Sequence, residues 1–519
     1  MVAIATAPAS SVLGAPGARP GIAGTAYDTA WLAGVPDPAD PGAPRFPAAL
    51  AWLVEHQRPD GSWGGAVRYE HDRVLGTLAA LGSLAAFGRR AEDREAVARG
   101  TRYLWQRGHL LAGEPVEPVG CELLLPALVE RARHAGVPVP PHLDIYGRER
   151  AEKLRLLPPD ALYSPRVTVV HSLEFLGDAG DLAGLRAARG ANGALGNSPA
   201  ATAYYLARTD DPRALAYLED CLARNGGATA PVLHPCETFE LLWAAYHLFL
   251  AGAPAARLLG RADRATLAAA LRADGVSLSP TFPIADADDT AVALLLLHEL
   301  GEPVAPGVLA RFALGPGGCF ASFPHERHAS VGVNLHALHA IARVPGYRDR
   351  ERTMARLLDY LAGEQRGGLY WLDKWHISPF YATAHALCVL ADLPPDLAAR
   401  AAPLADRARE WVRQTQNADG SWGFYGEPTA EETAYGVLAL ARGAADRPSA
   451  RDRRRCAAGL RYLRTLDAAT AGTEDYPPLW IDKCLYTPTL VVRATIAAAL
   501  AVARGGRTTL DGEAKGAGR

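Results

Sequence analysis

Three aspartates stand close together at the start of an apolar segment, in the run Asp286-Ala287-Asp288-Asp289-Thr290 that precedes the apolar residues 291–297. Carboxylates crowded beside low-dielectric walls cannot all ionise near neutral pH, because each negative charge raises the pKa of its neighbours. At least one of the three should therefore retain its proton. A carboxyl group that stays neutral in this way is a candidate proton donor.

The same spacing also suits the N-terminal turn of a helix. There Asp286 or Asp288 would cap free backbone N–H groups, and all three negative charges would complement the helix dipole. Spacing alone does not decide between a helix cap and an acid, so both interpretations stay open at this point.

The composition limits the kinds of protein that can carry this motif. The chain has 519 residues and a formal net charge of -2. Its length predicts two to three domains. The charge balance, with short basic runs such as 451–455 mixed with acids, disfavours nucleic acid or an anionic membrane as a partner. Seven scattered cysteines without CxxC spacing indicate a reducing compartment and disfavour a zinc site.

The ends of the chain and its longest apolar runs predict a location. The N-terminus lacks a basic stretch ahead of an apolar core, so no secretory signal is expected. No apolar run approaches the roughly 20 residues that span a bilayer. These features predict a soluble cytoplasmic protein with disordered ends, at residues 1 to about 20 and at 505–519.

Segments with helical periodicity fill most of the chain, and Gly, Pro and Asp stand between them. Alternating strand patterns are scarce, so the sequence predicts an all-α fold. Many of the predicted helices are apolar on more than one side, as expected for the inner ring of a two-layer helical toroid. The predicted helices are 48–55, 73–87, 123–135, 200–207, 238–251, 290–300, 333–342, 382–390, 432–440 and 488–503.

An internal repeat supports this interpretation. Residues 52–64 and 411–423 share Trp, Gln and Asp-Gly-Ser-Trp-Gly at the same relative positions, and weaker copies occur at 191–195 and 365–371. Asp-Gly can form the turn after a helix, while the Gln and Trp side chains can tie that helix end to the next helix pair. Two strong copies far apart predict two related α-barrels, one in each half of the chain.

The Gln-to-Trp segments resemble the QW motifs of triterpene and diterpene cyclases, and Asp286-x-Asp288-Asp289 resembles the DxDD motif of class II terpene cyclases. Other segments resemble motifs of copalyl diphosphate synthases and follow in order along most of the chain. They are 25–31 (TAYDTAW, similar to SAYDTAW), 120–126 (GCELLLP, similar to GFExxFPSL), 144–146 (DIY), 171–174 (HSLE), 225–227 (NGG) and 479–486 (LWIDKCLY, similar to VWIGKTLY).

This resemblance implies a pair of α-barrels with the active site between them, the γ barrel being inserted after an N-terminal piece of the β barrel. We accordingly expect residues 1–41 to belong to the β domain and 42–255 to form the γ domain. Residues 256–504 would complete the β domain and carry the acidic motif, and 505–519 would be a tail.

The resemblance also implies an isomerase of the intramolecular lyase class, which cyclises an isoprenoid diphosphate by protonating an alkene and retains the diphosphate. The expected substrate is geranylgeranyl diphosphate, giving a bicyclic labdane-type or rearranged diphosphate. The alternative is farnesyl diphosphate, giving a drimane-type product as in drimenyl diphosphate synthases. Consistent with this chemistry, residues 210–214 lack the last acid of a DDxxD motif. A downstream class I synthase or phosphatase would use the product, and the protein would be a monomer or homodimer.

In this family Asp288 would be the proton donor, with Asp286 and Asp289 holding its proton in place and raising its acidity. Such an acid must face a dry pocket, because water would level the acid and trap the cation. Aromatic faces stabilise migrating positive charge, although an aromatic residue in a helical toroid is more often part of the core. The aromatic candidates are Tyr246, Phe282, Trp371, Trp375 and Tyr381.

Basic and acidic residues elsewhere match positions that contact the diphosphate or Mg²⁺ in the family. Lys153 stands in a K-L-x-x-x-P context similar to that of a diphosphate-contacting lysine, and a compact ammonium suits phosphate. A solvated lysine is the alternative. The further candidates for the diphosphate are Lys483, Tyr486 and Lys374. The candidates for Mg²⁺, which prefers hard oxygen ligands, are Glu114, Glu117 and Glu122, which could equally be ordinary loop acids.

The residues that would end the reaction match the family less completely. His171 matches the histidine of a His–Asn pair that holds a water as the terminating base in ent-copalyl diphosphate synthases. The position of the Asn is taken by Val232, so another group would have to end the reaction here. A buried structural histidine is the alternative for His171.

Three other functions compete with this interpretation. A squalene-type cyclase is disfavoured by the few Gln-to-Trp repeats, the diphosphate-type lysine and the lack of an apolar membrane plateau. A zinc-containing toroid similar to protein prenyltransferases would need a Cys-His-Asp ligand set, which we do not recognise. In a noncatalytic helical-repeat binding module, residues 286–289 would be surface charge.

Overall fold

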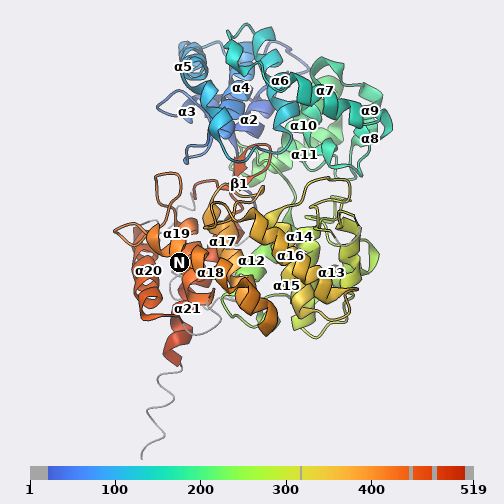
Figure 1. Cartoon of the computed structure of the whole chain (residues 1–519). Coiled ribbons are helices and arrows are strands. Elements are labelled where there is room, and N and C mark those ends of the chain that lie inside the picture. Colours follow the sequence, from blue (N-terminus) through green and yellow to red (C-terminus); the bar gives the residue numbers. More distant parts are fainter. Residues whose placement is uncertain (1–20, 316–317, 444–447, 470–475, 509–519) are drawn as a thin grey trace, which may run out of the picture.

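The computed structural model describes residues 21–315, 318–443, 448–469 and 476–508. They are mainly helical, and the β-structure that is resolved into strands is one antiparallel hairpin, β1 (Trp480–Ile481) and β2 (Leu485–Tyr486). Two helical units lie one above the other, with the hairpin between them (Figure 1). The predicted all-α fold is therefore confirmed.

The upper unit in Figure 1, the first barrel, is a closed ring of helices in which each packs on the next and the last returns to the first. Further helices pack on the outside of this ring or connect its members. The inner ring is α2 (Ala26–Ala33), α4 (Glu70–Phe87), α6 (Cys121–His134), η4 (Thr168–Ala179) and α10 (Pro199–Thr209). The others are α3 (Pro47–Glu55), α5 (Ala91–Arg107), η2 (Gly108–Gly113), η3 (Pro141–Leu143), α7 (Gly147–Leu156), α8 (Pro159–Leu162), α9 (Leu182–Ala188) and α11 (Pro212–Arg224).

The lower unit, the second barrel, is built in the same way. Its inner ring is α12 (Glu237–Leu250), α14 (Ala287–Glu299), α15 (Val331–Arg343), α17 (Pro379–Ala391), α19 (Ala430–Arg442) and α21 (Thr489–Thr508). Its outer helices and connections are η5 (Ala255–Arg257), α13 (Arg261–Ala273), η6 (Pro306–Phe312), α16 (Arg350–Glu364), α18 (Pro395–Gln414) and α20 (Ala450–Ala469).

Burial explains why inner and outer helices have different sequences. In α14 every residue from Ala287 to Leu297 is buried, so the helix is apolar all round apart from the acids of its first turn. In the outer helix α18 the buried residues recur at intervals of three and four, from Ala401 through Ala408 to Val412. An inner helix is surrounded by other helices, whereas an outer helix keeps one charged face in water.

The two strong Gln-to-Trp segments form equivalent ties between helices. Gln416 Nε2 donates to the carbonyl oxygens of Gly420 and Arg455, both at 2.9 Å, which joins the end of α18 to α20. Trp422 Nε1 donates to the carbonyl oxygen of Val412 at 2.8 Å. In the first barrel Gln57 makes the matching pair of bonds, and in this way joins the end of α3 to α5.

The observed barrels correct the expected domain boundaries. Residues 1–41 were expected to belong to the β domain, and the described start of the chain does pair with the entry to α21 through a bridge between Ile22 and Pro488. Helix α2 nevertheless closes the ring of the first barrel. Helix α12 closes the ring of the second barrel, so the first barrel ends before it rather than at residue 255.

The physical reason for both differences is that α2 and α12 are apolar on more than one side, a pattern that predicts an inner position without saying in which barrel. Helix α21 also continues to Thr508, past the expected start of a tail at residue 505. The expected disordered ends at 1–20 and 509–519 lie outside the described residues.

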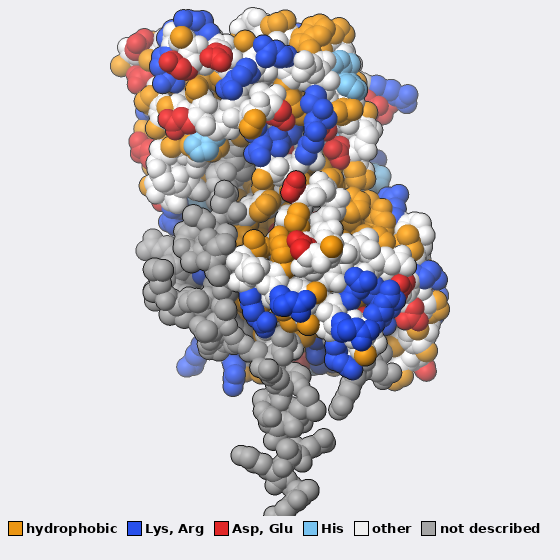
Figure 2. All heavy atoms as spheres, turned by 90° about the vertical axis from the view of Figure 1, so that its left-hand side faces the viewer, with side chains coloured by type: hydrophobic (Ala, Val, Ile, Leu, Met, Phe, Trp, Pro, Cys, Tyr) orange, Lys and Arg blue, Asp and Glu red, His pale blue; other side chains and the backbone are white. Residues whose placement is uncertain are grey.

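The surface differs between the barrels and the waist where they meet. On the face in Figure 2, hydrophobic side chains gather at the waist, and charged side chains lie above and below it. Within the ranges that the structure describes, no helix combines the length and apolar character needed to cross a membrane.

Candidate active site

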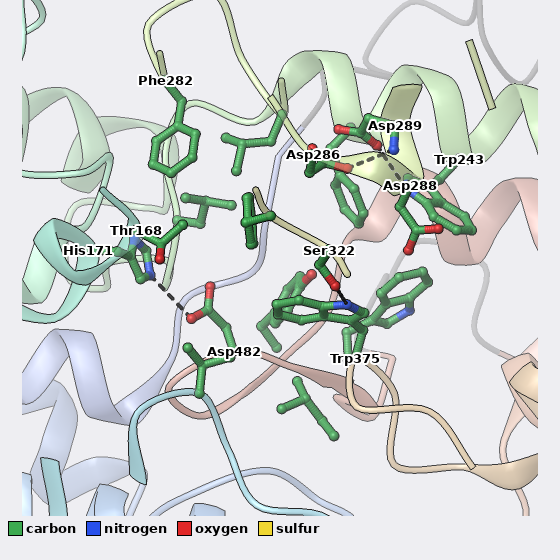
Figure 3. A pocket seen from close by; sticks show the side chains of 18 of the residues that line it. Thr168, His171, Trp243, Phe282, Asp286, Asp288, Asp289, Ser322, Trp375 and Asp482 are labelled. Carbon is green, nitrogen blue, oxygen red and sulfur yellow. Dashed lines mark hydrogen bonds and ion pairs between the residues drawn. The ribbon is translucent and has the colours of Figure 1, made fainter. Parts of the chain in front are cut away.

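A cavity lies where the two barrels meet, between the N-terminal end of α14 and the turn of the β1–β2 hairpin (Figure 3). Its empty volume, including the mouth, is about 880 Å³. The first barrel and its loops contribute Val119, Thr168 and His171. The rest of the lining is Leu233, Phe239, Trp243, Leu278, Phe282, Asp286, Asp288, Asp289, Ser322, Phe323, Trp375, Tyr381, Trp480, Ile481, Asp482 and Tyr486.

The three aspartates of the acidic motif all line this cavity at the start of α14. Asp286 is the N-cap residue, and its Oδ1 accepts a 2.7 Å hydrogen bond from the backbone N–H of Asp289. Asp289 Oδ1 accepts a 3.1 Å hydrogen bond from Trp243 Nε1. The cap interpretation and the acid interpretation are therefore compatible, because the cap fixes the turn from which Asp288 enters the cavity.

Burial controls the protonation of these acids, whose residues are at most 8% exposed. Burial and then the charge of Asp289 raise the pKa of Asp286 well above its usual range. Burial and the charge of Asp288 raise the pKa of Asp289 to about 7. Burial also raises the pKa of Asp288, against an opposite effect of His336. The cluster therefore retains protons near neutral pH.

A chain of hydrogen bonds runs from Asp288 through the interior of the second barrel. His336 Nδ1 lies 2.6 Å from Asp288 Oδ1, and His336 Nε2 lies 2.9 Å from His385 Nδ1. His385 Nε2 lies 3.0 Å from His247 Nε2, and the Thr495 hydroxyl lies 2.8 Å from His247 Nδ1. Burial lowers the pKa of His247 to about 3 and the pKa of His385 well below its usual value, so both rings are neutral.

A neutral imidazole donates through one nitrogen and accepts through the other, so when His336 has the same neutral form as His247 and His385 the bonds of this chain point in one of two directions. In one direction the Thr495 hydroxyl donates to the Val491 carbonyl oxygen, 2.9 Å away, and accepts from His247. His247 then accepts from His385, His385 accepts from His336, and His336 accepts the proton of Asp288. When the hydroxyl donates to His247, the order reverses and His336 donates to Asp288 Oδ1. The acid proton of Asp288 then resides on its other oxygen and is free for a reaction in the cavity.

These histidines were not among the sequence candidates, although a signal for them existed. His247, His336 and His385 each fall within a helix that was predicted as apolar, in 238–251, 333–342 and 382–390. A polar side chain buried in such a helix needs a hydrogen-bond partner. Three of them in three inner helices therefore indicate a buried polar network.

Three of the five aromatic candidates line the cavity, namely Phe282, Trp375 and Tyr381. Trp371 does not, because its Nε1 donates to the carbonyl oxygen of Leu361 at 2.7 Å as part of the weaker Gln-to-Trp copy. Its assignment as a cation-stabilising residue is corrected to a helix tie.

Tyr246 also lies outside the cavity lining. Its hydroxyl lies 3.0 Å from His339 Nδ1, and its ring packs edge-on against His336 behind the acid. The aromatic lining residues that the sequence did not single out are Phe239, Trp243, Phe323 and Trp480. Trp243 also stacks on the ring of His385, with ring centroids 5.9 Å apart.

The four candidates for the diphosphate do not gather in one place. Lys483 is fully buried, and its Nζ donates to Glu174 at 2.8 Å and to Ser198 Oγ at 2.5 Å, so its assignment to the diphosphate is corrected to a structural ion pair. Tyr486 lines the cavity. Lys374 lies over the ring of the cavity residue Trp375, at 4.8 Å from its centroid.

The remaining lysine candidate, Lys153, lies on the outer helix α7 and is half exposed, where it pairs with Glu122. The other two glutamates have partners of their own. Glu114 accepts from the backbone N–H of Glu70 at 3.0 Å, and Glu117 accepts from the Tyr146 hydroxyl at 2.6 Å. No group of three metal-binding side chains is found among the described residues. As arranged here, Glu114, Glu117 and Glu122 do not form a Mg²⁺ site.

His171 lies in the cavity wall, on the side of the first barrel (Figure 3). Its Nδ1 donates to the Gly196 carbonyl oxygen at 2.8 Å, and its Nε2 lies 3.2 Å from Asp482 Oδ1. Val232 is buried and does not line the cavity. The partner of His171 is therefore a carboxylate from the β1–β2 turn, which the sequence did not single out.

Residues 327–475 match the family model of the squalene-hopene cyclase C-terminal domain. The chain is 31% identical over 509 residues to a type B diterpene cyclase of Mycobacterium tuberculosis, with 92% of this chain and 95% of the relative covered. It is 35% identical over 473 residues to an ent-copalyl diphosphate synthase of a Streptomyces species, with 87% of each covered. The solved ent-copalyl diphosphate synthase from Streptomyces platensis matches with a TM-score of 0.77 at 32% identity, covering 95% of this chain and 98% of the other.

Proposed function

The chain belongs to the class II diterpene cyclases, the family of the copalyl diphosphate synthases, and from this premise we propose that it cyclises geranylgeranyl diphosphate to a bicyclic diphosphate of labdane or rearranged type. The observation that carries the proposal is the state of Asp288. Its carboxyl group is buried, has a raised pKa, is hydrogen-bonded to His336 on one side and lines a largely aromatic cavity on the other.

The reaction follows from this arrangement. Asp288 donates its proton to the terminal double bond of the prenyl chain, whose electron pair forms the new C–H bond. The neighbouring double bonds attack the resulting cation in turn and close two rings. The faces of Trp243, Tyr381 and Trp480 stabilise the positive charge, and the apolar walls keep water out. The C–O bond to the diphosphate takes no part, so the diphosphate is retained.

For the diphosphate we propose contacts from Lys374, Tyr486 and Lys153, the three candidates that remain after Lys483 is assigned to its ion pair. Lys374 lies over the ring of the cavity residue Trp375, and its ammonium pairs with Glu326 at 2.6 Å. Replacing Lys374 or Lys153 by Ala should raise KM for the prenyl diphosphate more than it lowers kcat, since each removes ground-state binding to phosphate. An unchanged KM in either variant removes that lysine from the site.

We propose Mg²⁺ as the cofactor, with the substrate diphosphate supplying oxygen ligands, because the three glutamates do not form a site by themselves. Chelation of Mg²⁺ should then lower turnover. Replacing Glu117 by Gln should leave the Mg²⁺ dependence as it is in the wild type, and a shifted Mg²⁺ requirement in that variant would restore Glu117 as a ligand.

The experiment that tests the function is incubation of the protein and Mg²⁺ with farnesyl, geranylgeranyl and geranylfarnesyl diphosphate, followed by dephosphorylation and identification of cyclic alcohols. Geranylgeranyl diphosphate should give the main bicyclic product, and Asp288→Asn should abolish it. Asp274→Asn is the matched control, because Asp274 is an exposed acid of the same barrel that pairs with Arg311. Preferred turnover of farnesyl diphosphate would change the substrate assignment, and no cyclic product from any of the three would refute the proposal.

A further inference from the structure

We infer that Asp482, held by His171, is the general base that ends the cation cascade, an inference that rests on the proposed function and names a second catalytic group in the same cavity. Asp482 occupies the turn between β1 and β2 and lines the cavity together with Asp288. Figure 3 shows it on a different side of the cavity from the aspartates of α14.

The contacts of His171 fix the orientation of its ring toward Asp482. A carbonyl oxygen can only accept, so the Nδ1 that faces the Gly196 carbonyl carries a hydrogen. In a neutral ring Nε2 would then present a lone pair to Asp482 Oδ1, 3.2 Å away, and the two would repel. One more proton therefore lies between them. With that proton the two groups attract each other, so His171 holds Asp482 in the cavity wall.

The surroundings of Asp482 favour the ionised form of its carboxyl group. Its burial would raise the pKa, but the charge and hydrogen bond of His171, together with Lys483, lower it below the usual value. The backbone N–H of Lys483 also donates to Asp482 Oδ1 at 2.7 Å. The oxygen bound in this way is Oδ1, and in Figure 3 the other oxygen carries no dashed line and points toward the middle of the cavity. That oxygen is free to accept a proton.

The position of the carboxylate suits the hydrocarbon part of the substrate rather than its diphosphate. Lys483, next to it in sequence, points away from the cavity and is paired with Glu174. A carboxylate lining an apolar cavity would repel a diphosphate and attract a carbocation. In the segment 479–486, Asp482 also stands where the similar VWIGKTLY motif has glycine, so that motif has no carboxylate at this position.

The step balances without a further reactant. The free oxygen of Asp482 takes a proton from a carbon next to the cationic centre, and the electron pair of that C–H bond forms the product alkene. Asp482 becomes a neutral acid. One proton passes from Asp288 to the substrate and one from the substrate to Asp482 in each turnover, and water reverses this after the product leaves.

The test is the product distribution of Asp482→Asn, which keeps the shape of the side chain and removes its charge. Consumption of geranylgeranyl diphosphate should continue, because Asp288 still donates its proton. The share of the wild-type alkene should fall about tenfold, in favour of hydroxylated products from water capture or rearranged products. Asp482→Gly should give the same change and serves as the second variant if Asp482→Asn does not fold.

Asp220→Asn is the matched control, because Asp220 pairs with His234 Nε2 at 3.0 Å on the surface of the same barrel as His171. It should keep the wild-type product. An unchanged product profile in folded Asp482→Asn or Asp482→Gly overturns the inference and leaves the proposed function standing. If the wild type cyclises no prenyl diphosphate, both fail, because there is then no cation for Asp482 to deprotonate.

Discussion

Replacing His336 by Leu removes a 2.6 Å hydrogen bond from the carboxyl group of Asp288. As Asp288 gives up its proton it becomes a carboxylate, and a hydrogen bond to a charged group contributes about 1.5–3 kcal/mol. A tenfold change in rate corresponds to about 1.36 kcal/mol. The kcat of His336→Leu should therefore fall about 10- to 150-fold.

The effect should decrease along the histidine chain. His385 does not contact Asp288 but donates to or accepts from His336 at 2.9 Å, which fixes the nitrogen through which His336 donates. An ordinary buried hydrogen bond contributes about 0.5–1.5 kcal/mol, so kcat of His385→Leu should fall about 2- to 10-fold. A larger loss in His385→Leu than in His336→Leu would contradict a chain that acts through His336.

The pH dependence separates this effect from a loss of packing. Asp288 must be protonated to react, so activity is lost as pH rises through its pKa. Because His336 lowers that pKa, His336→Leu should shift the loss of activity to higher pH in a plot of kcat/KM against pH. The assay is turnover of geranylgeranyl diphosphate with the cyclic product measured after dephosphorylation.

His339→Leu is the matched control for these variants. His339 is buried on the same helix, α15, but its partners are Tyr246 and Asp392, each at 3.0 Å, and it makes no link to Asp288. It should lose stability as His336→Leu does, yet keep the rate and the pH profile. Equal losses of kcat in the two variants, or a shift of the His336→Leu profile to lower pH, would refute the reasoning.

Three further predictions concern stability. Folding raises the pKa of Asp289 from 3.8 to about 7, so the fold loses stability as pH rises through this range. The melting temperature of Asp289→Asn should therefore fall less than that of the wild type between about pH 5 and pH 8. Gln416→Leu removes three hydrogen bonds and should lower the free energy of unfolding in urea by about 1–3 kcal/mol. Gln414→Leu at the exposed end of α18 should change it by less than about 0.5 kcal/mol. Lys483→Met leaves Glu174 buried without this lysine and should lower the free energy of unfolding by about 3–5 kcal/mol. KM for the substrate should not rise, and a raised KM would return Lys483 to the diphosphate site.

The sequence allowed the inner rings of the fold to be predicted better than the outer layers. The predicted helices 290–300 and 382–390 lie almost wholly within α14 and α17, because helices surrounded by others are apolar over long stretches. Outer helices such as α5 and α20 were not predicted. They carry many charged side chains and bury only a narrow face, so their apolar periodicity is weak.

In the site, the sequence indicated which residues carry charge but not which way their side chains point. Lys483 and Asp482 are neighbours in one turn, yet only Asp482 faces the cavity, while Lys483 reaches Glu174, 309 positions away in the chain. A motif match carries no information on this choice, because adjacent residues of a hairpin point to opposite sides. Trp371 was the more predictable case, since its place in a Gln-to-Trp copy already indicated a helix tie.

Asp288 and Asp482 are the same residue type in one cavity, but their surroundings push their protonation in opposite directions. Burial favours the neutral form of Asp288 on α14, whereas the interaction with His171 favours the carboxylate of Asp482 in the β1–β2 turn. Two carboxyl groups whose pKa values are separated in this way divide the roles of acid and base between them. Substitutions on α15 and α17 should therefore change the rate of initiation, and substitutions in the β1–β2 turn should change which product forms, with little effect of either set on the other step.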